Sequence, residues 1–194
     1  MRERRAGLME SSDPQVSPGS LLLAPPESED PNFRRTVVLI CEHSEEGSFG
    51  LILNRPLKLH LDEVLEDDLP AQPLGLGGPV QQNTLHYLHR FGDRVSGSIE
   101  IADDVFWGGD FESIRRILGE EQEAGSDLRL FLGYAGWAAG QLGEEMALGG
   151  WLLTQVKPEY VFAPDPHLLW RAVLRGMGGK YAVLANFPDD PRLN

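Results

Sequence analysis

The chain contains a single cysteine, Cys41, and a histidine follows two residues later at His43. A thiolate beside an imidazole is the arrangement that nucleophilic and redox-active cysteines use. Residues two apart on a strand share a face, but their side chains start roughly 6–7 Å apart, whereas a nucleophile and its base need about 3 Å. The spacing therefore favours a buried cysteine that packs as a small hydrophobic residue, with His43 at the rim. A thiol-based enzyme or redox sensor centred on Cys41 is the alternative.

A second candidate is the glycine-containing stretch LFLGYAGWAAGQLGEE, residues 130–145. It predicts a strand that passes into a helix near Gly133 and Gly136, where exposed backbone N–H groups could bind an anion. The stretch matches neither the dinucleotide-binding nor the phosphate-loop pattern, and Ala135 occupies the nucleophile position of a would-be G-x-S-x-G motif. The sequence instead favours glycines that let Trp137 and the helix pack closely on the sheet.

Arg35 directly precedes the apolar run TVVLIC, residues 36–41. A guanidinium beside a buried strand is expected to meet a carboxylate, such as Asp30, or the anionic group of a ligand. Asn54 ends the next apolar run, FGLIL, and is expected to reach the same region.

The remaining histidines do not predict a metal site. His86 and His89 lie three apart in a predicted strand, so they face opposite sides. There is no HExxH motif and no second cysteine. The sequence predicts neither a metal nor a cofactor.

Strands and helices that could position these residues are mixed along the chain without strict alternation. Apolar and alternating runs predict strands at 20–24, 36–41, 49–53, 84–90, 98–108 (one or two), 128–134, 151–156 and 159–162. Helical spacing and capping residues predict helices at 59–67, 111–123 (after Asp110), 138–149 and 166–176 (after Asp165). Residues 73–80 read as a tight glycine loop. This mixture predicts an α/β, α+β-like, single compact domain with helices packed on a mixed sheet.

Composition narrows the class of protein. The chain has 194 residues, 41% of them hydrophobic, which suits one domain with a sizeable core. Residues 1–18 carry equal numbers of arginines and acids and predict a disordered leader before a domain at 19–194. The net charge of −13 therefore falls on the domain. Such a surface repels phosphate backbones and anionic membranes, so it disfavours direct nucleic-acid binding.

Compartment is predicted from two further features. One cysteine excludes an internal disulfide and favours a reducing compartment. The N-terminus lacks the apolar segment of a secretory signal, and the most apolar uncharged run, 130–143, is too short and too glycine-rich to span a bilayer. A cytoplasmic protein without a membrane segment is expected.

Several blocks taken together resemble the AlgH/YqgE family of bacterial proteins. They are GSLLLAPP, DPNFRRTVVLICEH, GSFGLILNRP, GGPV, and LFLGYAGWAAGQLGEE followed by WLL, in consistent order over residues 19–180. The resemblance implies a compact α/β domain with a mixed, strongly curved sheet in a cytosolic protein. Members are often labelled transcriptional regulators, from the association of AlgH with control of alginate production, and the family has no established biochemical activity. The tail after Tyr181 fits the pattern poorly.

The resemblance identifies the residues of this chain that match the family's motifs, but it assigns none of them a catalytic role. These positions are Arg35, Thr36, Cys41, Glu42, His43, Asn54, Arg55, Pro56, Gly78, Pro79, Gly133, Gly136, Trp137, Gly140, Gln141 and Leu142. From them and from the residue patterns, the candidate ligand-binding or functional surface comprises Arg35, Thr36, Cys41, His43, Asn54, Arg55, Gly133, Gly136, Trp137 and Gln141.

The sequence therefore favours a non-enzymatic regulatory protein, or a module that binds a small ligand or a protein partner of unknown identity. Such a protein would act without binding DNA directly. Direct transcriptional control is a third reading, which rests on the family label.

Overall fold

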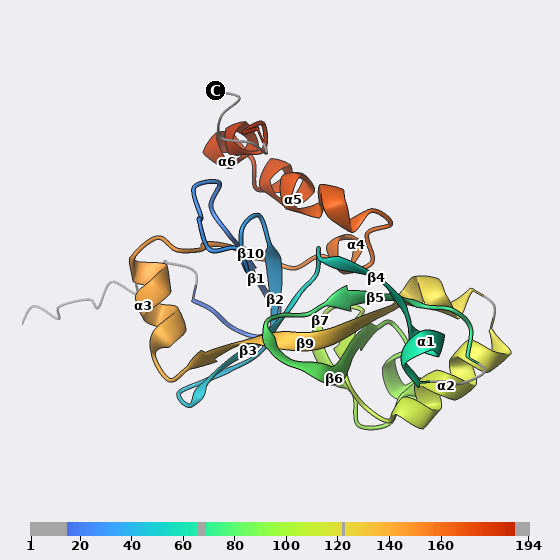
Figure 1. Ribbon diagram of the computed structural model, residues 1–194. Coiled ribbons are helices and arrows are strands. Elements are labelled where there is room, and N and C mark those ends of the chain that lie inside the picture. Colours follow the sequence, from blue (N-terminus) through green and yellow to red (C-terminus); the bar gives the residue numbers. More distant parts are fainter. Residues whose placement is uncertain (1–14, 66–68, 122, 189–194) are drawn as a thin grey trace, which may run out of the picture.

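The structure is a computed structural model that describes residues 15–65, 69–121 and 123–188 (Figure 1). Its strands are β1 (Ser20–Leu23), β2 (Val37–Ser44), β3 (Gly47–Ile52), β4 (Pro56–His60), β5 (Pro73–Leu76), β6 (Val80–His89), β7 (Ile99–Ala102), β8 (Val105–Trp107), β9 (Leu128–Ala138) and β10 (Leu152–Gln155). Its α-helices are α1 (Leu61–Leu65), α2 (Phe111–Glu120), α3 (Gln141–Ala147), α4 (Pro158–Val161), α5 (Leu169–Met177) and α6 (Gly179–Leu184). The 3₁₀ turns are η1 (Gly92–Arg94), η2 (Ala124–Asp127) and η3 (Pro166–Leu168).

The strands form one curled, mixed sheet, as predicted. Its main path runs β10-β1-β2-β3-β9-β6-β8-β7, and β5 joins β4 to β9. The β5–β9 pair is parallel, and the other described pairs are antiparallel. Strand β9 is the junction, because its first part pairs with β5 and β6 and its last part pairs with β3.

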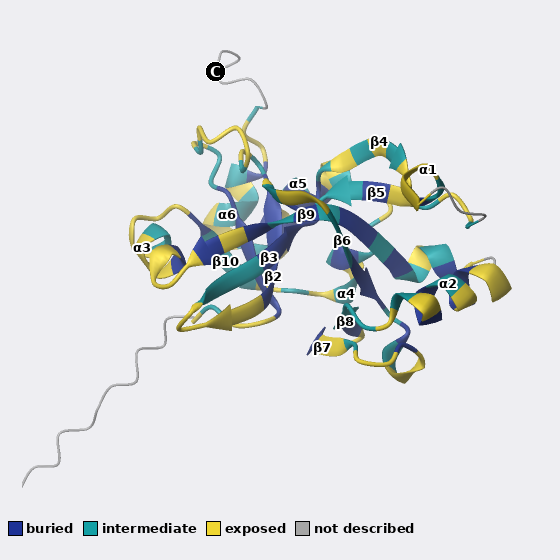
Figure 2. Cartoon of the chain, turned by 60° about the horizontal axis from the view of Figure 1, so that its bottom comes forward, coloured by how far each residue is buried: buried dark blue, intermediate teal, exposed yellow. Residues whose placement is uncertain are grey.

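Both faces of β1 and β2 are covered, which explains their uninterrupted apolar sequences. Leu39 and Cys41 face the C-terminal core, where α5 packs, whereas Val38 and Ile40 face the core beneath α3. The third core lies between α2 and the β5, β6 and β9 strands. In Figure 2 the central strands are mostly dark blue, and the outer turns of α2 and α3 are yellow.

The helices with clear sequence signals form as predicted. Asp110 caps α2 by accepting a hydrogen bond from the Ser113 N–H, 3.0 Å away. The α2 side chains at Ile114, Ile117 and Leu118 are buried on one stripe. Asp165 accepts from the His167 N–H in η3, and α5 follows directly.

Several predicted elements differ in the structure. Residues 159–162 were expected to be extended, but 159–161 belong to α4 and Phe162 caps its C-terminal end. Pro158 suits the first helical position, and its carbonyl accepts the Phe162 N–H. The glycine loop at 73–80 contains β5, because its backbone pairs in parallel with β9. The predicted helix at 59–67 begins as β4, and α1 covers Leu61–Leu65; residues 66 and 67 lie outside the described part. Helix α6 had no counterpart among the predicted elements.

Most of the predicted leader, residues 1–14, lies outside the described part of the chain. The described remainder leads into β1. Val16 packs against the core beneath α3, and the Ser17 carbonyl accepts the Ser20 N–H at 3.0 Å.

Candidate functional site

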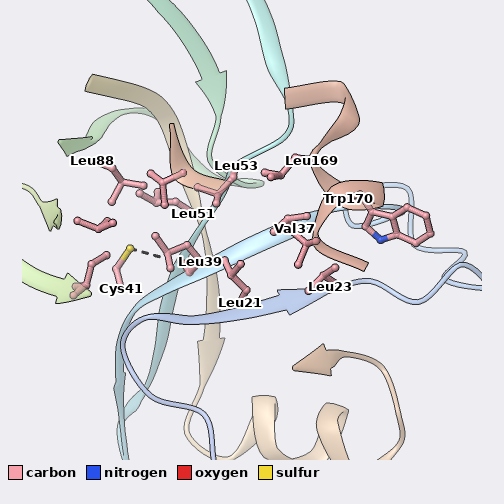
Figure 3. Close-up of a cluster of buried hydrophobic side chains, with 14 of the residues drawn as sticks. Leu21, Leu23, Val37, Leu39, Cys41, Leu51, Leu53, Leu88, Leu169 and Trp170 are labelled. Carbon is pink, nitrogen blue, oxygen red and sulfur yellow. Dashed lines mark hydrogen bonds between the residues drawn. The ribbon is translucent and has the colours of Figure 1, made fainter. Parts of the chain in front are cut away.

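The Cys41 thiol lies inside the C-terminal core, surrounded by leucine side chains (Figure 3). Its side chain is 3% exposed, and its Sγ lies 3.8 Å from the Leu39 carbonyl oxygen. Burial, and then the charge of Glu42, raise the pKa of the thiol far above its ordinary value. The thiol therefore stays protonated, which is the opposite of what a nucleophilic cysteine requires.

His43 does not join Cys41. The β2–β3 register shifts between Ile40 and Glu42, so the ladder is irregular at Cys41 and the simple two-residue period fails there. His43 is exposed, and its Nδ1 lies 2.8 Å from the Ser48 Oγ across the hairpin.

Four of the expected surface residues do come together, at the start of β2. The buried Asn54 side chain accepts the Val37 N–H at 2.9 Å and donates to the Arg35 carbonyl at 2.8 Å. Thr36 donates its hydroxyl to the Phe33 carbonyl at 2.7 Å, and Arg55 donates to the Arg34 carbonyl. These bonds stabilise the loop that leads into β2.

The Arg35 guanidinium faces the C-terminal segment. It lies 4.7 Å from the Trp170 ring and donates to the carbonyls of Phe187, at 3.1 Å, and Pro188. Arg171 donates to the Phe187 carbonyl at 3.0 Å and to that of Ala185. Cations are favoured at these carbonyls, which follow the end of α6. Asp30, the expected partner of Arg35, accepts the Asn32 N–H at 2.8 Å.

Trp137 and Gln141 anchor α3 to the sheet. The Glu145 carboxylate accepts the indole N–H of Trp137 at 3.0 Å, that of Trp151 at 2.8 Å and the Gln141 amide at 2.9 Å. Sequence reasoning missed Glu145 as the common acceptor. The four-residue spacing of Gln141 and Glu145 on one helix was the available signal.

Gly133 and Gly136 lie within β9, so the prediction that a strand passes into a helix there is wrong. The helix starts after Gly140. Gly133 has a φ of 68°, and a Cβ there would lie 2.7 Å from the Val80 carbonyl oxygen and 2.8 Å from that of Gly78. Glycine is required at this position because two backbone segments touch where β9 changes partners.

A further candidate site is an apolar pocket of about 270 Å³ between the sheet and the C-terminal helices. We call it the β5–α4 pocket. Its lining residues are Leu53, Pro56, Pro73, Leu74, Gly75, Arg129, Leu130, Phe131, Tyr160, Val161, Ala163, Pro164, Pro166 and Leu169. Among the lining residues that the structure describes, Arg129 is the charged one.

Arg129 is held against the pocket wall by main-chain acceptors. Its guanidinium donates to the carbonyl oxygen of the neighbouring Leu128 at 3.0 Å and to that of Ala163 at 3.1 Å. Its Cζ lies 5.8 Å from the Phe162 ring. Burial, then the charge of Arg90, lower the pKa of Arg129, and Asp127 opposes them.

The nearby carboxylates are engaged elsewhere. Arg90 pairs with Asp104 at 3.1 Å and with Asp127 at 3.4 Å. Within the described ranges, no carboxylate lies within ion-pair distance of Arg129. Sequence reasoning missed Arg129, although a lone charge inside the apolar run LRLFL was a usable signal.

The described part of the chain shows neither a metal-ligand cluster nor a membrane-spanning helix. Among the residues that the structure describes, no group of three or more His, Cys, Asp or Glu side chains is placed to hold a metal ion. In the same part of the chain, every helix is too short or too polar to cross a bilayer.

Comparison with known proteins gives consistent matches along the chain. The AlgH-like family profile matches residues 21–182. A protein of Chlorobaculum tepidum is 43% identical over 180 residues, covering 92% of this chain and 96% of the relative. A protein of Cytophaga hutchinsonii is 42% identical over 182 residues, covering 92% of this chain and 100% of the relative.

Two solved structures share the fold. A crystal structure of a Corynebacterium diphtheriae protein has a TM-score of 0.76 at 30% identity and covers 90% of this chain and 94% of its own. The solution structure of the AlgH protein of Pseudomonas aeruginosa has a TM-score of 0.69 at 32% identity, with coverages of 90% and 98%.

Proposed function

The chain belongs to the AlgH-like family, and we propose that it is a non-enzymatic regulatory module that binds a small, mostly apolar ligand in the β5–α4 pocket. The pocket itself is the observation that carries this proposal. Ligand sites are concave and largely apolar, with a few polar groups that orient the ligand. At about 270 Å³ the β5–α4 pocket falls just below the range typical of drug-sized ligands, roughly 300–1,000 Å³, so its ligand is small.

The position of the pocket supports a regulatory role. One wall is the β4–β5–β9 part of the sheet, and the other is the segment from Tyr160 to Leu169, which contains the end of α4 and leads into α5. A ligand would therefore contact two structural elements at once and bias how they pack. A protein partner that touches the C-terminal helices would sense that change.

The net charge of −13 disfavours direct binding to DNA. The proposed module would act through its ligand and a protein partner.

The alternative, a thiol enzyme or redox sensor at Cys41, is weakened by the burial of the sulfur and the raised pKa of the thiol. His43 is held by Ser48, on the exposed side of the hairpin.

The test is a fragment screen on isotope-labelled protein, read by methyl chemical shifts. Binding in the β5–α4 pocket should shift the methyl signals of Leu74, Val161 and Leu169. The pocket-filling variant Ala163→Phe should lose these shifts, because the new ring occupies the site and leaves the Ala163 carbonyl in place.

The matched control is Ala147→Phe, which makes the same change at an exposed position of α3. It should bind fragments as the parent protein does. Fragments that shift no pocket methyl, or that bind Ala163→Phe undiminished, would contradict the proposal.

A further inference from the structure

We infer that the β5–α4 pocket selects a small monocarboxylate with a short apolar tail, whose carboxylate pairs with Arg129; this deepens and rests on the proposed function. The inference starts from a mismatch. The wall of the pocket is almost wholly apolar, yet it carries one guanidinium. A charge placed beside apolar surface is stabilised when an opposite charge joins it.

The Arg129 guanidinium has N–H donors that its two main-chain hydrogen bonds do not use. Its two hydrogen bonds, to the neutral carbonyls of Leu128 and Ala163, use only part of the guanidinium's donor set. A planar fork that is already fixed by two main-chain bonds and by the Phe162 ring loses little freedom when it binds. A carboxylate is the group that matches such a fork in shape and charge.

The surroundings set the charge of the ligand. Arg90 lies over the same Phe162 ring, 4.4 Å from its centroid, and forms ion pairs with both Asp104 and Asp127. Arg129 is therefore the cation at the pocket that has no carboxylate of the described chain within ion-pair distance. One cation suits a monoanion better than a phosphate dianion, which would need further donors.

The other lining residues determine which apolar group the ligand can carry. Leu53, Leu74, Val161 and Leu169 offer apolar surface. Besides Arg129, Tyr160 is the described lining residue whose side chain has a polar end. Hydrocarbon buried there stabilises the bound ligand in proportion to the apolar area removed from water. A short aliphatic or aryl-alkyl carboxylate fits both the charge and the volume.

The experiment compares octanoate with octanamide, which has the same tail and no charge. Both are titrated below their aggregation concentrations against the full chain, by calorimetry and by methyl shifts of Leu74 and Leu169. Octanoate should bind at least about tenfold more tightly than octanamide, as expected for a charge-assisted pair. Arg129→Gln should remove that preference and retain octanamide binding. Arg129→Lys, which keeps the charge but not the fork, should retain part of it.

Arg116→Gln, on the exposed face of α2, is the control and should keep the full preference. Binding of neither probe would count against both the inference and the proposed function. Equal binding of the two probes at the pocket methyls would overturn the inference alone, and so would a carboxylate preference that survives in Arg129→Gln. If Arg129→Gln does not fold, the parent protein decides: octanoate must move the Arg129 guanidinium resonances and octanamide must not.

Discussion

The indole N–H groups of Trp137 and Trp151 converge on one oxygen, Oε2 of Glu145, at 3.0 and 2.8 Å. The two rings also pack edge-to-face, with centroids 5.9 Å apart. Phe33 stacks on Trp137 and meets Trp151 edge-to-face. One carboxylate thus joins the end of β9, helix α3 and the start of β10.

Replacing this carboxylate should destabilise the protein clearly. Glu145→Ala leaves two indole donors without their acceptor and should lower the free energy of unfolding by about 2 kcal/mol or more, since hydrogen bonds to charged groups contribute roughly 1.5–3 kcal/mol each. Urea denaturation followed by tryptophan fluorescence measures this loss. Glu144→Ala, on the exposed face of the same helix, is the control and should change little; equal losses in both variants would show that the shared acceptor is unimportant.

Stability should fall on acidification because of His89. This fully buried ring bonds through Nε2 to the Gly108 carbonyl and accepts the Phe91 N–H at Nδ1, so the fold requires its neutral form. Burial lowers the pKa of His89, and also that of His86. Their contribution is fully present above the unfolded pKa of about 6.5 and is lost as pH falls toward the folded pKa.

The measurement is the free energy of unfolding between pH 8 and pH 5. The parent protein should lose stability below about pH 6.5. The His89→Gln variant should have a lower free energy of unfolding at pH 8, and that free energy should change less with pH than in the parent. His167→Gln, at an exposed position, should keep the parent slope. A pH-independent parent would refute the assignment.

Cys41 should resist modification in the folded protein. Its burial and raised pKa predict that a thiol reagent reacts at the rate of unfolding, and that reaction is fast in denaturant. Alkylation followed by mass spectrometry from pH 7 to pH 9 tests this. Rapid labelling of the native protein would revive the thiol hypothesis.

Two glycines should respond in opposite ways to alanine. Gly133→Ala places a Cβ against two backbone carbonyls at positive φ and should cost more than about 1 kcal/mol of stability. Gly143→Ala, in α3 with open space around it, should be neutral or stabilise by roughly 0.5–1 kcal/mol. Thermal unfolding of the two variants tests this prediction. If both alanine variants unfold at a similarly lowered temperature, the loss is not specific to the backbone contact at Gly133.

The sequence by itself determined the parts of this protein that local chemistry specifies. The apolar runs of β1 and β2 predict strands covered on both faces, and the Asp110 cap with the stripe at Ile114, Ile117 and Leu118 predicts α2. Asn54 was expected near Arg35 because both flank paired strands, and it bonds there. The burial of Cys41 also followed from its apolar surroundings.

Only the tertiary structure decided the length of β9, the role of Gly133 and the β5–α4 pocket. Strand β9 continues past Gly133 because β3 and β6 supply partners from distant parts of the chain. The pocket joins Leu53, Leu74, Arg129 and Ala163, which no local pattern connects. Neither propensity nor spacing encodes such contacts, because they exist only after chain closure brings the segments together and packing determines which side chains face the same space.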